Sequence, residues 1–196
     1  MNAAQEWKVR GVALACLMAI GACESGELDP VCAEPSELEL PEPEPLVDPL
    51  AWQLTPPERD PLVAHRPELL ACAADSWGEE FGLLEVWTGG CNYFSAEQPL
   101  ARALERGDLL RVSLWWAALL APEPAHAHLA LLVGGELLWE REVEIPGAAE
   151  ALELEFDSPV SAPAGAPLVL HLHNHGQNTW TFAGLEWLAP HERSCE

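Results

Sequence analysis

Hydrophobic and polar residues alternate along most of the chain from Leu83 onward. An alternation with a period of two places successive side chains on opposite faces of a β-strand. In 108–120 one side carries Leu110, Val112, Leu114 and Trp116, and the other carries Arg111 and Ser113. The pattern predicts strands in 83–88, 108–120, 126–145, 151–156, 167–173 and 179–188.

The stretch 126–145 is predicted to be a β-hairpin. Its two apolar runs are separated by Gly134-Gly135, and glycine is the residue that a two-residue hairpin turn needs. Carrying the register back from this turn places His128 opposite Arg141 and puts Trp139 on the face of the histidines. An arginine beside His128 would discourage a bound cation.

These strands and the turn signals between them predict an all-β fold. We expect an antiparallel β-sandwich of jelly-roll or Greek-key type, because the long connections 95–107 and 157–166 suit strands that cross between sheets. The stretch 67–75, with the sequence PELLACAAD, is the one convincing helical segment.

The chain divides into three predicted parts: a signal peptide at 1–22, an acidic, proline-rich tether at 23–66 and a β-sandwich domain at 67–196. Half of the 18 prolines fall between residues 24 and 61, among many acidic residues. Such a composition favours an extended, disordered tether. Cys32 and Trp52 interrupt it and indicate that part of the tether is held against the domain.

The N-terminal segment has the features of a secretory signal. Lys8 and Arg10 precede about a dozen small and apolar residues, which would span roughly 18 Å as a helix and are too few to cross a bilayer. The segment ends in Ile20-Gly21-Ala22-Cys23, which resembles the lipobox of bacterial lipoproteins. This resemblance implies cleavage before Cys23, a lipid on its sulfur and a location in the cell envelope. Glu24 favours the outer membrane.

The cysteines fit an oxidising compartment. The chain has six cysteines, and removal of Cys16 with acylation of Cys23 leaves four, which allow three pairings. We favour disulfides between Cys72 and Cys91, which would close a local loop, and between Cys32 and Cys195, which would join the chain ends. The spacings do not match zinc motifs, so a disulfide role is favoured over a metal role.

The charge of the chain excludes one class of partner. The formal net charge is −23, and Lys8 is the one lysine. Such an acidic surface repels phosphate backbones, so we expect no nucleic acid partner.

Five histidines form a candidate metal site: His126, His128, His171, His173 and His175. Alternation places the histidines of 167–173 on the face of Val169, opposite the leucines that fill the core. Two H-x-H strands could supply three or four imidazoles to Zn²⁺ or Cu²⁺. The stretch GAPLVLHLH resembles the opening of a cupin metal motif, although the glutamate of that motif is missing. A structural role at a solvated sheet rim is the alternative.

A second candidate site is a ligand-binding surface made of Trp115, Trp139, Asn174, Gln177 and Trp180. Because Trp115 and Trp116 are adjacent, one of the two must point away from the surface on which the other packs. The predicted sandwich resembles jelly-roll carbohydrate-binding modules. The resemblance implies that an exposed indole beside amide groups stacks on a sugar ring.

No catalytic residue is predicted, because G-x-S-x-G, H-E-x-x-H and P-loop motifs are absent from the sequence. The preferred hypothesis is a lipid-anchored, extracytoplasmic, non-catalytic module without a cofactor that binds a glycan, a cell-envelope component or a protein. The alternative is a histidine-rich copper or zinc protein of cupin or copper-protein type. A passive envelope protein without a small ligand is the third hypothesis.

Overall fold

The computed structural model describes residues 42–189. The predicted signal peptide, the predicted lipidation at Cys23 and the predicted Cys32–Cys195 disulfide lie outside this range, as does the tether up to residue 41. Within the described range, no helix has the length and apolar character needed to cross a membrane.

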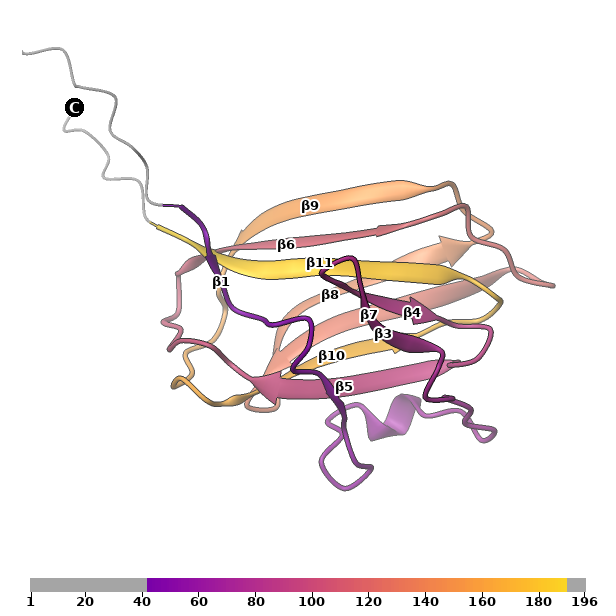
Figure 1. Ribbon diagram of the computed structural model, residues 1–196, viewed down its shortest axis with the longest axis horizontal. Helices are drawn as coiled ribbons and strands as arrows, with labels where there is room; N and C mark the ends of the chain where they lie inside the picture. The colour runs from indigo at the N-terminus through magenta and orange to yellow at the C-terminus, as the bar shows by residue number, and fades with distance from the viewer. Residues whose placement is uncertain (1–41, 190–196) are drawn as a thin grey trace, which may run out of the picture. The chain divides into compact units, whose positions relative to one another are not determined.

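The domain is an antiparallel β-sandwich, which confirms the predicted fold class (Figure 1). Sheet I has the order β3-β4-β11-β6-β9, with β1 also paired to β11, and sheet II has the order β2-β5-β10-β7-β8. Sheet I comprises β1 (Glu44–Pro45), β3 (Trp77–Glu80), β4 (Leu83–Trp87), β6 (Leu109–Trp116), β9 (Glu150–Asp157) and β11 (Thr179–Leu188). Sheet II comprises β2 (Gln53–Leu54), β5 (Tyr93–Pro99), β7 (Ala125–Val133), β8 (Glu136–Ile145) and β10 (Pro167–His173).

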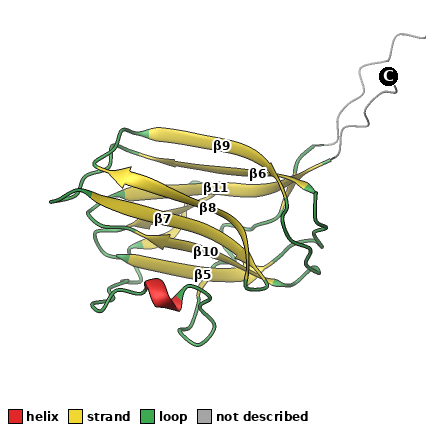
Figure 2. Cartoon of the chain, turned by 180° about the vertical axis from the view of Figure 1, so that it is seen from behind, coloured by secondary structure: helices red, strands yellow, loops and turns green. Residues whose placement is uncertain are grey.

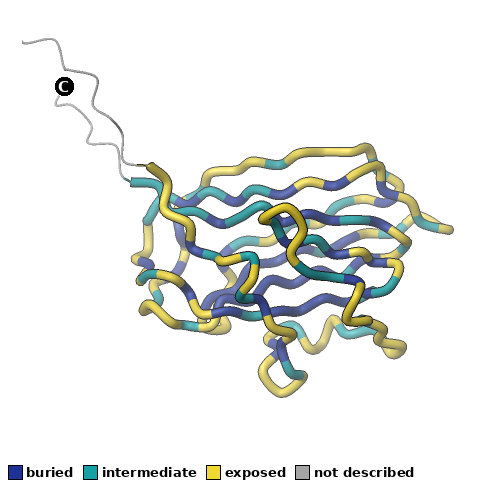
Figure 3. Tube along the Cα trace, in the orientation of Figure 1, coloured by how far each residue is buried: buried dark blue, intermediate teal, exposed yellow. Residues whose placement is uncertain are grey.

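The core lies between the two sheets and follows the predicted alternation. In β6 the buried residues are Leu110, Val112, Leu114 and Trp116. In β10 the leucines 168, 170 and 172 join the same core, whereas Val169 belongs to a separate small cluster on the outer face of sheet II. Figure 3 shows the buried positions along the central strands and the exposed ones at the loops.

Residues 42–66 pack against the sandwich, which corrects the predicted tether boundary at residue 66. β1 pairs with β11 and β2 pairs with β5. Leu46 is fully buried and Trp52 is 6% exposed, so apolar side chains of this proline-rich stretch fill part of the core. Their burial outweighs the extended, self-repelling character of the surrounding acidic residues.

The predicted helix at 67–75 is absent. The short helix of the described chain is the 3₁₀ turn η1 (Val63–His65), which Figure 2 shows beside β5. Leu69 and Ala71 are instead bound by the Asn92 side chain, which donates to Leu69 O and accepts from Ala71 N. The predicted disulfide between Cys72 and Cys91 is confirmed beside these contacts.

The segment 95–107 was predicted to be a connection between strands, but its first residues, 95–99, form most of strand β5. This strand shows no alternation, because its residues from Tyr93 to Ala96 are buried on both faces. Sheet I covers the inner face, where Phe94 packs against Trp77 of β3, and the 60–66 segment covers the outer face. The strand β3 was also not predicted.

The predicted hairpin forms, but its register is wrong beyond the turn. Val133 pairs with Glu136 as expected, and then a β-bulge shifts the pairing between Leu131 and Leu132. Leu131 consequently pairs with Trp139, and His128 pairs with Glu142 rather than Arg141. The bulge turns Trp139 and Arg141 to the inner side of sheet II and leaves acidic residues beside the histidines.

Candidate functional site

Three histidines from three elements meet on the outer face of sheet II. His65 belongs to η1, His128 to β7 and His171 to β10. Each offers a ring nitrogen, and the three nitrogens lie within 4.8 Å of one another. The ring centroids are 5.0 Å apart for His65 and His128, 5.2 Å for His128 and His171, and 5.7 Å for His65 and His171.

The deepest member of this histidine cluster lacks hydrogen-bond partners. His171 is fully buried, and neither its Nδ1 nor its Nε2 has a partner within the described chain. The Nδ1 of His128 is also buried without a partner. An unsatisfied buried polar group costs about 1–3 kcal/mol, so three such nitrogens in one place require an explanation.

Burial and neighbouring histidines keep His171 neutral. Desolvation, followed by repulsion from His128 and His65, lowers the pKa of His171 to about 3. The pKa of His173 is lowered by desolvation and by its neighbour His175. The ring of His171 therefore has a free lone pair at neutral pH.

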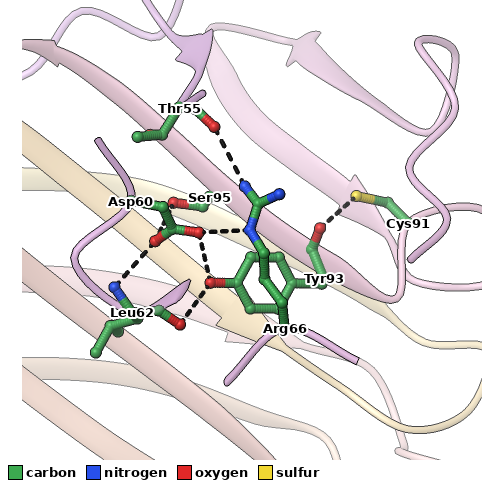
Figure 4. A network of polar contacts seen from close by, with 7 residues as sticks. All are labelled: Thr55, Asp60, Leu62, Arg66, Cys91, Tyr93 and Ser95. Carbon is green, nitrogen blue, oxygen red and sulfur yellow. Dashed lines mark hydrogen bonds and ion pairs between the residues drawn. The ribbon is translucent and has the colours of Figure 1, made fainter. Parts of the chain in front are cut away.

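A buried aspartate fixes the segment that carries His65. The side chain of Asp60 is fully buried, although this residue lies in the segment that was predicted to be a disordered tether. Its carboxylate accepts four hydrogen bonds, from Tyr93 Oη at 2.7 Å, Arg66 Nε at 2.9 Å, Leu62 N at 3.0 Å and Ser95 Oγ at 3.3 Å (Figure 4). Tyr93 and Ser95 belong to β5, so these bonds attach the 60–66 segment to sheet II.

These hydrogen bonds also keep Asp60 charged. Burial acts to raise its pKa, but the bonds from Tyr93, Arg66 and Leu62 outweigh burial and lower it. Burial and the bond to Asp60 raise the pKa of Tyr93, so its hydroxyl remains a donor. The result is a carboxylate close to the histidine cluster whose charge is compensated by Arg66.

The other predicted metal ligands are not part of this three-nitrogen cluster, although His173 pairs with His128 in the β10–β7 register. The rings of His173 and His175 pack against each other at a tilt of 44°, with centroids 4.9 Å apart, and His126 is exposed at the start of β7. His65 was missed because it lies in the presumed tether and belongs to no H-x-H pattern. The one sequence signal for it is the interruption of that stretch by apolar residues and a lone histidine.

An exposed tryptophan marks a second surface, on the outer face of sheet I. Trp115 is 40% exposed, whereas Trp116 on the opposite face is 3% exposed. The register partners of Trp115 are Thr181 on β11 and Ala151 on β9. Because these neighbours are small, they cannot cover the indole ring.

Trp115 borders a groove of roughly 540 Å³. The polar residues of its lining are Ser113, Glu153 and Glu186, and a β-bulge between Phe182 and Gly184 leaves Ala183 without a partner on β6. Arg111 Nε donates to Glu186 Oε2 at 2.9 Å and orients that carboxylate. The groove thus combines one exposed aromatic face with hydroxyl, carboxylate and backbone groups.

Most of the other residues predicted to contact a ligand pack inside the domain instead. Trp139 packs against the core, and Trp180 and Asn174 are each 2% exposed. Trp180 Nε1 donates to Asn174 Oδ1 at 3.2 Å, and Asn174 Nδ2 donates to Thr88 Oγ1 at 2.7 Å. The buried Trp180 and Asn174 side chains cannot contact a ligand at the surface, and Trp139 is partly buried against the core, whereas Gln177 is exposed on the loop after β10.

Comparison with known proteins found solved structures with low similarity to this chain. No protein-family model matches the chain, and no curated sequence matches it. A CBM4 carbohydrate-binding module is similar with a TM-score of 0.40 and 13% identity, over 76% of this chain and 96% of that one.

Two further modules were solved with sugars. TmCBM61 in complex with β-1,4-galactotriose gives a TM-score of 0.38 and 12% identity, over 75% of this chain and 99% of that one. The CBM51 from Clostridium perfringens GH95, in complex with methyl-galactose, gives a TM-score of 0.33 and 10% identity, over 76% of this chain and 95% of that one.

Proposed function

We propose that this protein is a non-catalytic module that binds a glycan in the groove beside Trp115. The observation that carries the proposal is the uncovered indole face of Trp115 on the outer face of sheet I. An aromatic ring of this kind packs against the C–H face of a sugar, and polar groups around it orient the hydroxyls.

The polar groups of the groove support a sugar ligand. The carboxylates of Glu153 and Glu186 accept hydrogen bonds from hydroxyls, and the Ser113 side chain both donates and accepts. The Arg111–Glu186 ion pair holds one carboxylate in place before the ligand arrives. A ligand that enters this groove therefore meets preoriented hydrogen-bonding groups.

Charge narrows the class of glycan. The chain carries a net charge of −23, and two of the groove residues are glutamates. Such a surface repels uronates, sulfates and phosphates and accepts neutral or amino sugars. We therefore propose a neutral or amino-substituted oligosaccharide as the ligand.

A glycan array followed by calorimetric titration of the strongest ligand tests the proposal. Trp115→Ala is expected to lower the affinity by at least tenfold. Trp87→Ala is the matched control, because Trp87 is 46% exposed on sheet I but does not line the groove. Binding of no glycan, or equal binding by Trp115→Ala and wild type, would overturn the proposal.

We also propose that Cys23 carries a lipid and holds the module at the bacterial cell envelope, in the outer membrane where one exists. The lipobox resemblance of Ile20-Gly21-Ala22-Cys23 supports this location. Expression in a bacterium with a labelled fatty acid tests it, and Cys23→Ser should abolish labelling. Equal labelling of Cys23→Ser would contradict the anchor.

A further inference from the structure

We propose that His65, His128 and His171 bind a divalent transition-metal ion, Zn²⁺ or Cu²⁺. The site lies on the outer face of sheet II and does not depend on the glycan-binding groove of sheet I. It differs from the five-histidine site expected from the sequence, because His65 replaces His126, His173 and His175.

The spacing of the nitrogens suits a metal ion. A tetrahedral ion with metal–nitrogen bonds of about 2.0–2.1 Å keeps neighbouring nitrogens about 3.4 Å apart. The three nitrogens here lie within 4.8 Å of one another, so small side-chain rotations bring them to that distance. His65 is exposed and belongs to a short turn, which leaves it free to make such a movement.

The unpartnered nitrogens are the second, independent observation. His171 is fully buried, with both ring nitrogens unpartnered in the described chain, and its ring lies against those of His65 and His128. No hydrogen-bond donor of the described chain reaches the lone pair of the neutral His171 ring, so this lone pair is free to coordinate a metal ion. Burial keeps this imidazole neutral, which is the protonation state that binds a metal.

The surroundings complete the site. His128 Nε2 lies 3.2 Å from Glu140 Oε2, while His128 Nδ1 is buried and unpartnered. A carboxylate on one ring nitrogen orients the other toward a metal, as in carboxylate–histidine–zinc arrangements. Asp60 lies behind the cluster as a carboxylate and acts electrostatically on His171.

The donor set selects the class of ion. Three imidazoles suit Zn²⁺ or Cu²⁺, whereas Mg²⁺ and Ca²⁺ prefer oxygen ligands. Because His65 lies in the 60–66 segment and the other two ligands lie in sheet II, the ion would clamp that segment to the sheet.

Metal analysis of the full chain, stripped with chelator and free of a histidine tag, tests the site. After incubation with Zn²⁺ or Cu²⁺ and removal of free ion, we expect one equivalent per chain. His65→Ala should weaken binding at least tenfold, and this exposed residue can be replaced without disturbing the core. His126→Ala, an exposed histidine on the same sheet, is the matched control and should bind as wild type.

Two results would overturn the site. The first is less than a tenth of an equivalent bound by the wild-type chain. The second is unchanged binding by His65→Ala, with loss on His173→Ala or His175→Ala, since the ion would then belong to the His173–His175 pair. For the Cu²⁺-loaded chain, electron paramagnetic resonance should show nitrogen coupling that decreases in His65→Ala.

Discussion

The imidazole Nε2 of His128 lies 3.2 Å from Oε2 of Glu140, across the β7–β8 hairpin. The register partner of Glu140 is Ala130, so its carboxylate reaches diagonally along the outer face of sheet II. This contact exists because the bulge at Leu131 and Leu132 moves Arg141 to the other face. The extra residue of the bulge thus places the carboxylate of Glu140, rather than the guanidinium of Arg141, beside His128.

Removal of that carboxylate should weaken the proposed metal site. Glu140→Ala frees the His128 ring, and outer-shell partners of this kind typically contribute 10–100-fold to metal affinity. We expect at least a tenfold loss of Zn²⁺ affinity in competition with a chelating dye. Glu142→Ala removes the same charge from the same strand face and should change the affinity by less than about threefold. Equal losses in both variants would contradict an orienting role for Glu140.

The buried His171 should make the metal-free protein sensitive to acid. Its pKa is about 3 in the folded chain, against an ordinary value of 6.5. Between these values the unfolded chain binds a proton that the folded chain does not, so the free energy of unfolding falls as the pH is lowered. The decrease reaches up to about 1.4 kcal/mol per pH unit, and the contribution is complete above pH 6.5.

Urea unfolding in chelator at pH 6.5 and pH 5.0 measures this effect. The titratable groups around His171 are His65, His128, His173, Asp60 and Tyr93, and of the charges that act on it Asp60 alone raises its pKa. His171→Asn should reduce the loss of stability between the two pH values, and His126→Ala should leave it unchanged. A pH dependence in His171→Asn equal to that of wild type would show that another group is responsible.

The Cys72–Cys91 disulfide should stabilise the domain through the unfolded state. The bond joins residues separated by 19 positions. A closed loop of this length corresponds to about 3 kcal/mol of lost chain entropy. The double variant Cys72→Ser/Cys91→Ser should therefore unfold at a lower urea concentration, with a larger m-value because its unfolded chain is more expanded. A midpoint equal to that of the oxidised wild type would contradict this contribution.

Asn174 should be required for the stability of the loop after β10. Its side chain accepts from Trp180 Nε1 and donates to Thr88 Oγ1, and all three groups are buried. Asn174→Ala leaves these partners unsatisfied and should lower the free energy of unfolding by about 1–3 kcal/mol. Gln177→Ala, on the exposed part of the same loop, should be close to neutral in the same denaturation experiment.

Alternation in the sequence predicted the faces of β6 and β10 correctly, because both strands have one apolar side that fills the core. It could not predict the bulge at Leu131 and Leu132. The consecutive apolar residues of that stretch fit either register, and tertiary packing of Trp139 decides between them.

The candidate sites were predicted less completely than the fold. Trp115 follows from its adjacency to a core-facing Trp116. His65 and Asp60 join sheet II through contacts more than 30 positions apart in the chain, which no local pattern records. The same contacts explain why His171 is buried rather than placed on a solvated rim.

The indole resonance of Trp115 offers the most direct test of the proposed glycan-binding groove. In a proton–nitrogen spectrum, with assignment by Trp115→Phe, titration with a neutral oligosaccharide selected on the array should shift the Trp115 Nε1–H signal. The Trp87 signal should stay in place. Saturable binding that leaves the Trp115 signal unmoved would contradict the assignment of the groove as the ligand site.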